Sequence, residues 1–306
     1  MAGMAEGGVG GPLNNPMELR APALLIPRAP QRRAVHAAVN DYGRPDANLR
    51  GCLNDQVALR EYLGECGYED VILLQDRDAT PGNTRQACRE QAAKSKPGDV
   101  LGLCYSGHGS FLPDTDGDEP VDHVDECLVM ADALRGGDFR AGCITDDDLA
   151  SWAAFVPRGV LLFGWLDSCH SGSMARAFTP ASVPMDAPRF LPPPDDELKR
   201  ARGSTRGGRI FRRRISGQII TEAMPETLLS GCAPDQTSAD SYIDGAWRGA
   251  FTHYMLKSLR SMPGASIASA HEQCVREIKR AGYSQTPQLE GRSANLRLPL
   301  FLRRQP

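Results

Sequence analysis

The stretch from Leu161 to Ser173 reads LLFGWLDSCHSGS and places a thiol directly after a hydrophobic run. The run, Val160 to Phe163, is too short to span a membrane, and it leads into the small and polar residues around Cys169. Strands that are hydrophobic on both faces are typical of parallel sheets covered by helices, whose chemistry lies beyond the carboxyl ends of the strands. We therefore predict a buried strand that presents Cys169 as a nucleophile.

A second hydrophobic run upstream ends in an imidazole. The sequence from Val100 to Gly109 is VLGLCYSGHG, so an apolar strand runs into a small-residue turn that carries His108. If the two strands are neighbours in a parallel sheet, His108 can activate the thiol of Cys169 or protonate an amine leaving group. His170 is a poorer candidate for the base, because adjacent residues point apart.

The two motifs together resemble a known family. YSGHG at Tyr105–Gly109 and DSCHSG at Asp167–Gly172 are similar to the His and Cys motifs of caspase-like peptidases, and of metacaspases in particular. SGCAPDQTSAD at Ser230–Asp240 and GAFT at Gly249–Thr252 are further family-like landmarks. The resemblance spans roughly residues 34–302. It implies an α/β fold, a caspase-like three-layer sandwich with a roughly six-stranded, mostly parallel sheet flanked by helices.

The length and charge of the chain limit its class and its partners. With 306 residues, one large α/β domain with tails fits best. The net charge of -3 is spread along the chain, which argues against nucleic acid or a membrane surface as a partner. The nine cysteines are scattered without CxxC spacing, so we expect reduced thiols. We expect a cytoplasmic protein, because no signal peptide or long apolar stretch is visible. We also expect the protein to be a monomer.

Composition divides the chain into four parts. Residues 1–33 are rich in Gly, Pro and Ala and read as a disordered leader. Residues 34–173 carry both motifs and correspond, by the resemblance, to the large subunit of a caspase-like fold. Residues 174–225 are rich in Pro and Arg and are expected to form a flexible linker outside the core. Residues 226–306 correspond to the small subunit.

Periodicity predicts the individual elements. Strand, helix, strand, helix, strand is the expected order up to His108, which is the pattern of a parallel α/β sheet. Thr145 is a predicted N-cap of a short helix whose first turn is acidic, and His36 is expected to be a packed histidine. The remaining expected elements are strands at 34–39, 71–74, 227–229 and 296–302, and helices at 48–65, 84–95, 250–260 and 267–281.

The resemblance implies roles for the two motif residues. Cys169 would attack the scissile carbonyl and His108 would act as acid and base, while backbone N–H groups of Cys169 and Gly109 would hold the oxyanion. The alternative is a buried structural thiol and an ordinary hydrogen-bonded histidine. The polar and small residues around Cys169 argue against a core environment.

Acidic residues at matching positions predict the specificity. Caspases bind aspartate through arginines, whereas metacaspases cut after Arg or Lys. Here the matching positions are Asp55 and Asp167, with Ser106 in the His turn, and Asp240 is a further candidate to shape the pocket. Carboxylates suit a guanidinium, so we predict cleavage after Arg, with Lys second. The alternative is that Asp55 faces solvent on its helix.

An acidic stretch suggests calcium, although not in an EF-hand. A loop beginning at Asp114 has Glu119 where glycine is required and Asp125 where glutamate is required. Metacaspases often bind calcium through separated aspartates, and the resemblance points to Asp125, Asp146 and Asp147 as Ca²⁺ ligands. The alternative is a solvated acidic loop followed by a capped helix.

The Arg-rich linker has three interpretations. A nucleic-acid arm is disfavoured, because few aromatic residues are interleaved and acidic residues interrupt the run. An inert solvated linker is the second. The third is self-cleavage between about Arg189 and Arg214, since an enzyme that cuts after Arg would hold these residues close to its own Cys169. The candidate arginines in the run are Arg200, Arg202, Arg206, Arg209 and Arg214.

The sequence therefore predicts a metacaspase-like cysteine endopeptidase acting on protein or peptide substrates. A catalytically silent interaction scaffold is the main alternative, and the presence of both Cys169 and His108 counts against it. Thiol redox sensing through Cys169 would need a resolving cysteine, and none lies close in the sequence.

Overall fold

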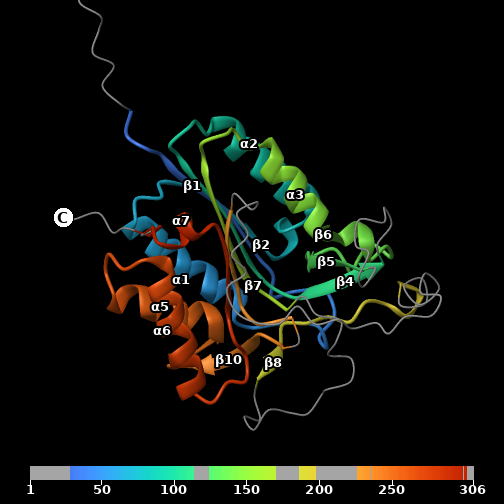
Figure 1. The fold of residues 1–306 in the computed structure, drawn as a ribbon. Helices are drawn as coiled ribbons and strands as arrows, with labels where there is room; N and C mark the ends of the chain where they lie inside the picture. The colour runs from blue at the N-terminus through green and yellow to red at the C-terminus, as the bar shows by residue number, and fades with distance from the viewer. Residues whose placement is uncertain are drawn as a thin grey trace, which may run out of the picture.

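The computed structural model describes residues 28–113, 124–169, 186–197, 226–234, 236–298 and 300–301. A six-stranded sheet forms its centre (Figure 1). The strand order is β12-β9-β7-β3-β1-β2, and β12 is the antiparallel member. The sheet confirms the predicted fold class and strand number. Its strands are β1 Arg32–Ala38, β2 Asp70–Gln75, β3 Val100–Ser106, β7 Leu161–Asp167, β9 Thr227–Ser230 and β12 Gln288–Gly291.

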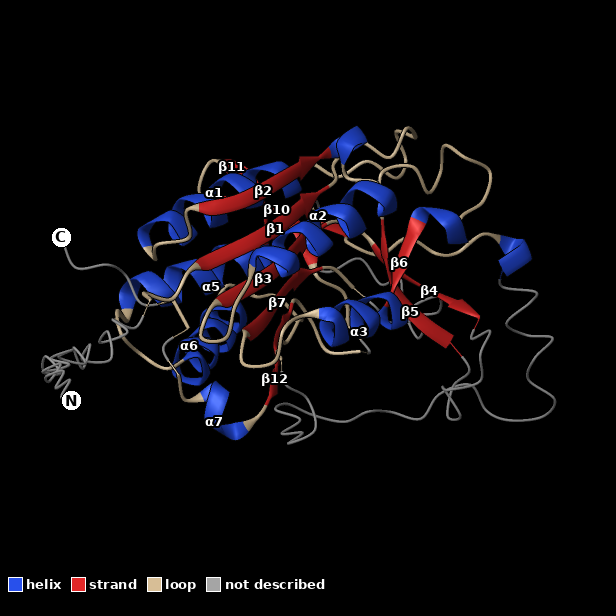
Figure 2. Ribbon diagram, turned by 90° about the horizontal axis from the view of Figure 1, so that it is seen from above, coloured by secondary structure: helices blue, strands red, loops and turns tan. Residues whose placement is uncertain are grey.

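Helices cover both faces of this sheet (Figure 2). One face packs against the helices that carry Leu59, Phe251 and Ile267, and this side holds the largest hydrophobic cluster. The opposite face packs against the helices that carry Ala92 and Trp152. The helices are α1 Cys52–Glu65, α5 Ala250–Ser261, α6 Ile267–Arg280 and α7 Ser293–Leu296 on the first side, and α2 Pro81–Lys94 and α3 Asp146–Phe155 on the second.

Two small sheets lie beyond the carboxyl ends of the central strands. In one, β4 pairs with β5, which pairs with β6; in the other, β10 lies between β8 and β11. None of the described helices is long and apolar enough to cross a membrane. The strands are β4 Gly109–Pro113, β5 Val124–Val129, β6 Cys143–Thr145, β8 Ala187–Pro188, β10 Ala239–Ile243 and β11 Ala246–Gly249.

The α3 cap agrees with its sequence signature. The Thr145 hydroxyl accepts a hydrogen bond from the Asp148 N–H, and the Asp148 carboxylate accepts one from the Thr145 N–H. This reciprocal capping box satisfies two backbone donors that a helix start leaves without partners. Three aspartates in the first turn also interact favourably with the helix dipole.

The final strand differs from the prediction. Residues 296–302 were expected to form it, but the last strand is β12 at Gln288–Gly291, followed by the short helix α7. Leu300 and Phe301 are buried in the main core without belonging to a strand. The apolar pattern of this segment therefore reflects burial, and a short apolar run cannot by itself distinguish a strand from other buried structure.

Candidate active site

The register of the central sheet brings His108 and Cys169 to one edge. β3 and β7 are parallel neighbours, and Ser106 lies opposite Asp167 in the pairing. His108 and Cys169 each follow two residues beyond these partners, as the strand prediction required. A Cβ atom on Gly109 would collide with the Cys169 carbonyl, so the residue after His108 must be glycine for the two loops to approach.

The His108 imidazole is held by backbone from another loop. Its Nε2 lies 2.7 Å from the Ala47 carbonyl oxygen, and because a carbonyl only accepts, Nε2 carries the proton. Nδ1 is buried and has no hydrogen-bond partner among the described residues. Burial lowers the pKa of His108 to about 4, against the opposing effect of interactions with the backbone carbonyls of Ala47 and Arg189. A neutral imidazole with a free Nδ1 lone pair can act as a base.

Ala47 is a functional contact that the sequence did not reveal. No third catalytic residue is evident from the motifs, and a backbone carbonyl leaves no signature in residue type. Tyr42 also supports the imidazole, because its hydroxyl accepts from the His108 N–H at 2.7 Å and its ring lies 4.8 Å from the imidazole. Together these contacts fix the ring in one orientation.

The Cys169 side chain is buried in a small cluster with Phe111, Phe190 and Cys232. The Ser238 N–H donates to Cys169 Sγ at 2.7 Å, which would stabilise negative charge on the sulfur. Cys232 is distant in sequence, so a search for cysteines near Cys169 could not find it. All nine cysteines of the chain are free, buried thiols.

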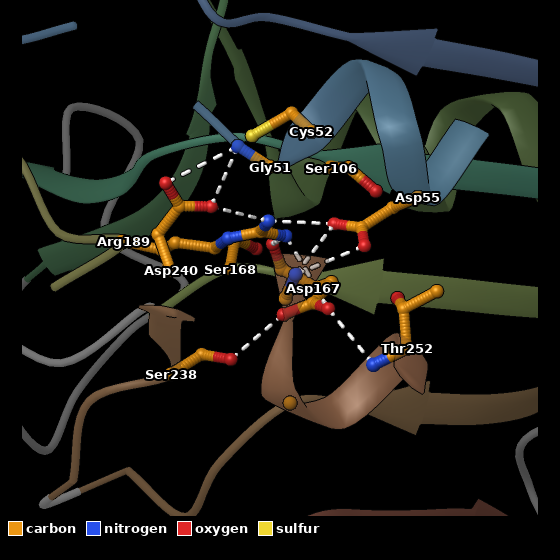
Figure 3. Close-up of polar contacts among 12 residues, drawn as sticks. Gly51, Cys52, Asp55, Ser106, Asp167, Ser168, Arg189, Ser238, Asp240 and Thr252 are labelled. Carbon is orange, nitrogen blue, oxygen red and sulfur yellow. Dashed lines mark hydrogen bonds and ion pairs between the residues drawn. The ribbon is translucent and has the colours of Figure 1, made fainter. Parts of the chain in front are cut away.

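An arginine in the first third of the predicted linker fills a pocket of three carboxylates (Figure 3). Arg189 is completely buried. Its Nη2 atom lies 2.6 Å from Asp55 Oδ2 and 2.8 Å from Asp240 Oδ1. Its Nη1 atom lies 3.3 Å from Asp167 Oδ2 and donates to the Asp167 carbonyl at 3.2 Å. The structure thus gathers all three predicted pocket aspartates around one guanidinium.

Backbone N–H groups hold each carboxylate in place. Because these bonds hold the carboxylates in position without any ligand, the pocket is preorganised, and preorganisation reduces the free-energy cost of binding. The contacts are Gly249 N–H to Asp55 at 2.9 Å, Thr252 N–H to Asp167 at 3.0 Å and Gly51 N–H to Asp240 at 3.0 Å.

The charge balance of the pocket favours a cation. Burial raises the pKa of Asp55 to about 7, although Arg189 opposes this shift. Burial alone would lower the pKa of Arg189, but the surrounding groups, Asp167 foremost, outweigh it and raise the pKa. Three carboxylates without a guanidinium would repel one another, so the pocket needs a positive group to be stable in its ionised form.

Ser106 lies near the pocket but faces another partner. Its buried hydroxyl is 3.5 Å from His36 Nε2. Burial lowers the pKa of His36 to about 3, so this histidine is neutral. His36 is therefore a packed, hydrogen-bonded histidine, as its position in the first strand indicated.

The backbone around Arg189 runs through the site as an added strand. β8 pairs with β10 in antiparallel fashion, and the Arg189 N–H donates to the Ser238 carbonyl at 2.9 Å. The Arg189 carbonyl oxygen accepts from the N–H groups of Cys169 at 3.1 Å and Gly109 at 3.0 Å. This segment was assigned to a flexible linker outside the core, but here it contributes a completely buried side chain.

The expected calcium ligands do not gather in the described structure. The buried Asp125 carboxylate lies 3.4 Å from an Arg140 guanidinium nitrogen, and Asp146 and Asp147 begin α3. Among the described residues, no three His, Cys, Asp or Glu side chains are placed to hold a metal ion. Calcium binding by Asp125, Asp146 and Asp147 therefore stays a prediction.

The other arginines proposed for self-cleavage cannot be compared with Arg189. They lie outside the described residues, and so do His170 and the remainder of the Cys motif. The residues concerned are Arg200, Arg202, Arg206, Arg209 and Arg214.

The fold and the paired His108 and Cys169 define a caspase-like cysteine peptidase. A family model described as "Metacaspase, peptidase C14 domain" matches residues 32–177. Metacaspase-1 of Scheffersomyces stipitis is 31% identical over 292 residues, covering 85% of this chain and 70% of the relative. Metacaspase-1B of Aspergillus terreus is 30% identical over 290 residues, covering 85% and 74%. The chain belongs to the metacaspase family and is a cysteine peptidase, hence a hydrolase.

Two solved structures share the fold of this chain. Protein GSU0716 from Geobacter sulfurreducens is 27% identical, with a TM-score of 0.64 over 90% of this chain and all of that protein. Caspase-1 from Spodoptera frugiperda is 12% identical, with a TM-score of 0.52 over 90% and 91% of the two chains. The second likeness establishes only the shared fold.

Proposed function

We propose that this chain is an endopeptidase that cleaves after arginine, with lysine second. The observation that carries the proposal is the buried Arg189 guanidinium, which contacts Asp55, Asp167 and Asp240. A planar guanidinium offers several donors in a fixed geometry and reaches all three carboxylates at once. A lysine ammonium is a single point of charge and would satisfy fewer of them.

Acylation follows from the contacts around the Arg189 carbonyl. His108 Nδ1 accepts the proton of the Cys169 thiol, and the sulfur attacks the carbonyl carbon of the residue in the acidic pocket. The oxygen that becomes negative is stabilised by the Cys169 and Gly109 N–H groups, which already bind the ground-state oxygen. The C–N bond breaks as His108 protonates the departing amine, which leaves an acyl-enzyme thioester.

Deacylation uses the same groups, with water as the nucleophile in place of the Cys169 thiol. His108 takes a proton from water, which attacks the thioester, and the same N–H groups hold the second oxyanion. The carboxylate product leaves, and the proton returns to Cys169. The Ala47 carbonyl keeps Nε2 protonated throughout, so the same nitrogen, Nδ1, exchanges protons in both stages.

The same geometry supports self-processing at the Arg189–Phe190 bond. The chain's own arginine occupies the pocket, and its carbonyl accepts both oxyanion donors. Extended pairing of β8 with β10 positions the preceding residues as a protease binds a peptide strand. We therefore place the self-cleavage, expected between about Arg189 and Arg214, at the first of these residues.

An uncut chain would also inhibit itself. A foreign substrate must displace Arg189, and a tethered competitor has an effective concentration in the millimolar range. Cutting the bond after Arg189 frees the segment on one side of the pocket. Self-processing would therefore increase the rate at which other substrates are cleaved.

Intact-mass measurement of the full chain tests the proposal. The native protein is expected to yield fragments 1–189 and 190–306, whereas Cys169→Ala and Arg189→Gln are expected to yield neither. Arg189→Lys should restore the same cut at a lower rate. A cut that persists at this bond in Cys169→Ala, or its complete absence in the native chain, would contradict the assignment.

Calcium activation is a separate proposal that rests on the family resemblance and on Asp125, Asp146 and Asp147. No step of the cleavage is assigned to the ion. Calorimetric titration of the full Cys169→Ala chain with CaCl₂ tests it, with Asp146→Asn/Asp147→Asn as the comparison. Loss of a binding isotherm in the double variant is the expected result, and an unchanged isotherm would exclude these two ligands.

We also propose that the protein acts as a cytoplasmic monomer on protein or peptide substrates, without nucleic acid or membrane partners. Size-exclusion chromatography with light scattering tests the oligomeric state. The alternative of a catalytically silent scaffold predicts that the protein hydrolyses no arginyl peptide. The same preparation can be used to measure this hydrolysis.

A further inference from the structure

The residue after the acidic-pocket arginine is itself enclosed in an apolar pocket. Phe190 is 6% exposed, although it belongs to the segment predicted to form a flexible linker outside the core. Its ring is nearly parallel to that of Phe111, with centroids 6.3 Å apart and planes inclined by 13°. Cys169 and Cys232 complete the same buried cluster. The side chain on the leaving-group side of the Arg189–Phe190 bond therefore has a defined place.

The walls of this pocket are fixed by backbone contacts to the reacting segment. Phe111 belongs to β4, whose first residue, Gly109, donates its N–H to the Arg189 carbonyl. The Gly109 carbonyl accepts from the Leu191 N–H at 3.0 Å, so β4 holds the chain on both sides of the bond. A peptide bound in this way must direct the side chain after its arginine toward Phe111.

The other wall is also fixed. Cys232 Sγ lies 3.3 Å from the Gln236 carbonyl oxygen and 3.9 Å from that of Ser168. Its interaction with Cys169, together with burial, raises the pKa of Cys232 well above its usual value, so this wall is an uncharged thiol. Glu126 lies opposite Phe111 in the β4–β5 pairing, and its exposed carboxylate contributes to the raised pKa of Cys232. The pocket thus suits an apolar ring and disfavours a carboxylate.

We propose that Phe111 and Cys232 form a specificity pocket for the residue after the scissile bond, and that the enzyme prefers an aromatic residue there. The substrate class becomes arginine followed by an aromatic side chain. This inference rests on the proposed cleavage after arginine and extends it to the leaving-group side. Phe190 is then the chain's own example of the preferred residue.

The size of the preference for an aromatic residue can be estimated from the burial of its side chain. Burying a phenylalanine side chain that glycine lacks favours the aromatic substrate by roughly tenfold or more in kcat/KM. Ring stacking on Phe111 adds to this ratio. Aspartate at the same position must lose its hydration beside Glu126, so its peptide should be cut more slowly than the glycine peptide.

Matched peptides test the pocket directly. Quenched fluorescent peptides containing Ala-Pro-Arg-Phe-Leu, Ala-Pro-Arg-Gly-Leu or Ala-Pro-Arg-Asp-Leu are cleaved by the full-length chain, and kcat/KM is measured for each. The ratio of the Phe to the Gly value should be about ten or more in the native protein and in Phe155→Ala, which changes an exposed phenylalanine on α3. In Phe111→Ala it should fall to near one.

Ratios make the result independent of folding yield. Both peptides are measured on one sample of each variant, so a smaller folded fraction lowers both values equally. Equal cleavage of the Phe and Gly peptides by the native chain would overturn the pocket while leaving cleavage after arginine intact. If no arginyl peptide is cut, the proposed function fails and the pocket assignment fails with it.

A second measurement uses the chain as its own substrate. Phe190→Gly should slow the appearance of the 1–189 fragment by roughly tenfold or more, and Phe190→Trp should restore most of the rate. An unchanged rate in Phe190→Gly would contradict the pocket, because the arginine and the oxyanion contacts are the same in both chains.

Discussion

The backbone N–H of Cys169 donates to the carbonyl oxygen of Arg189 at 3.1 Å, so the nucleophilic residue already binds the backbone of its own chain. The arginine side chain is simultaneously buried among the pocket carboxylates. Arg189, which belongs to a Pro-rich segment without clear periodicity, thus places its side chain in the charged pocket and its carbonyl oxygen at the predicted oxyanion donors. Under the proposed self-processing, this segment is the first substrate of the enzyme and is already bound.

Removing the arginine should open the pocket to added ligands. In the inactive Cys169→Ala background, Arg189→Ala should bind a fluorescent Ala-Pro-Arg peptide roughly tenfold more tightly or better, because the tethered competitor is gone. Fluorescence anisotropy measures the dissociation constants. The peptide affinity of the Arg189→Lys chain should lie between those of the chains with Arg189 and with Arg189→Ala. Equal affinity with and without the Arg189→Ala substitution would show that the segment does not compete with the peptide for the pocket.

A methyl group in the pocket wall should weaken arginine binding strongly. A Cβ atom at position 249 would collide with Asp167 Oδ2 and lie 2.6 Å from Arg189 Nη1. Gly249→Ala is therefore expected to lower kcat/KM for an arginyl reporter by on the order of a hundredfold. Gly82→Ala is the matched control, since its nearest neighbour is 3.9 Å away. Comparable activity of the two variants would contradict the pocket.

Cleavage should weaken on acidification because Asp55 takes up a proton. With a pKa of about 7, this carboxyl is partly protonated just below neutrality and then offers the guanidinium less charge. His108, with a pKa of about 4, stays neutral over the same range and does not cause the loss. We expect kcat/KM, which reports the free enzyme, to fall between about pH 8 and about pH 6.

The variant Asp55→Asn tests whether protonation of Asp55 causes the fall of kcat/KM on acidification. It should be less active at every pH and should lack the acidic limb near neutrality, because no proton is taken up at position 55. A limb of the same midpoint in Asp55→Asn would assign the titration to another group.

The α3 capping box should contribute measurably to stability. Thr145→Ala removes the hydroxyl that accepts the Asp148 N–H and should lower the free energy of unfolding by about 1 kcal/mol. Urea denaturation of the Cys169→Ala chain, which avoids self-cleavage, provides the measurement. Thr145→Ser keeps the acceptor and should lose much less, so equal losses in both variants would argue against the cap.

Much of the fold is predictable from local pattern. The two apolar runs that end in His108 and Cys169 are the parallel neighbours β3 and β7, and the Thr145 cap begins α3 as its residues indicate. The segment after Gly291 differs from its predicted strand, because Phe301 packs edge-on against Phe163 and Trp165 of β7 without joining the sheet. Burial produces an apolar pattern whether or not the backbone joins a sheet.

The occupant of the pocket is not predictable from local pattern. Asp55, Asp167 and Asp240 are marked by their motifs, but Arg189 is one arginine among many in its segment. Its burial depends on three carboxylates from distant parts of the chain, each fixed by a different backbone donor. Likewise the Ala47 carbonyl and the Cys232 thiol reach the site only through the folding of remote loops.

The sequence by itself determined which two strands end in the nucleophile and the base, since hydrophobic periodicity and strand-end residues are local properties. It also determined the acidic character of the pocket. Tertiary structure decided which arginine fills that pocket, which nitrogen of His108 is free and which side chain lies beyond the scissile bond. These depend on contacts between residues far apart in the chain, and the free energy of such contacts is set only when distant segments are brought together in the folded state.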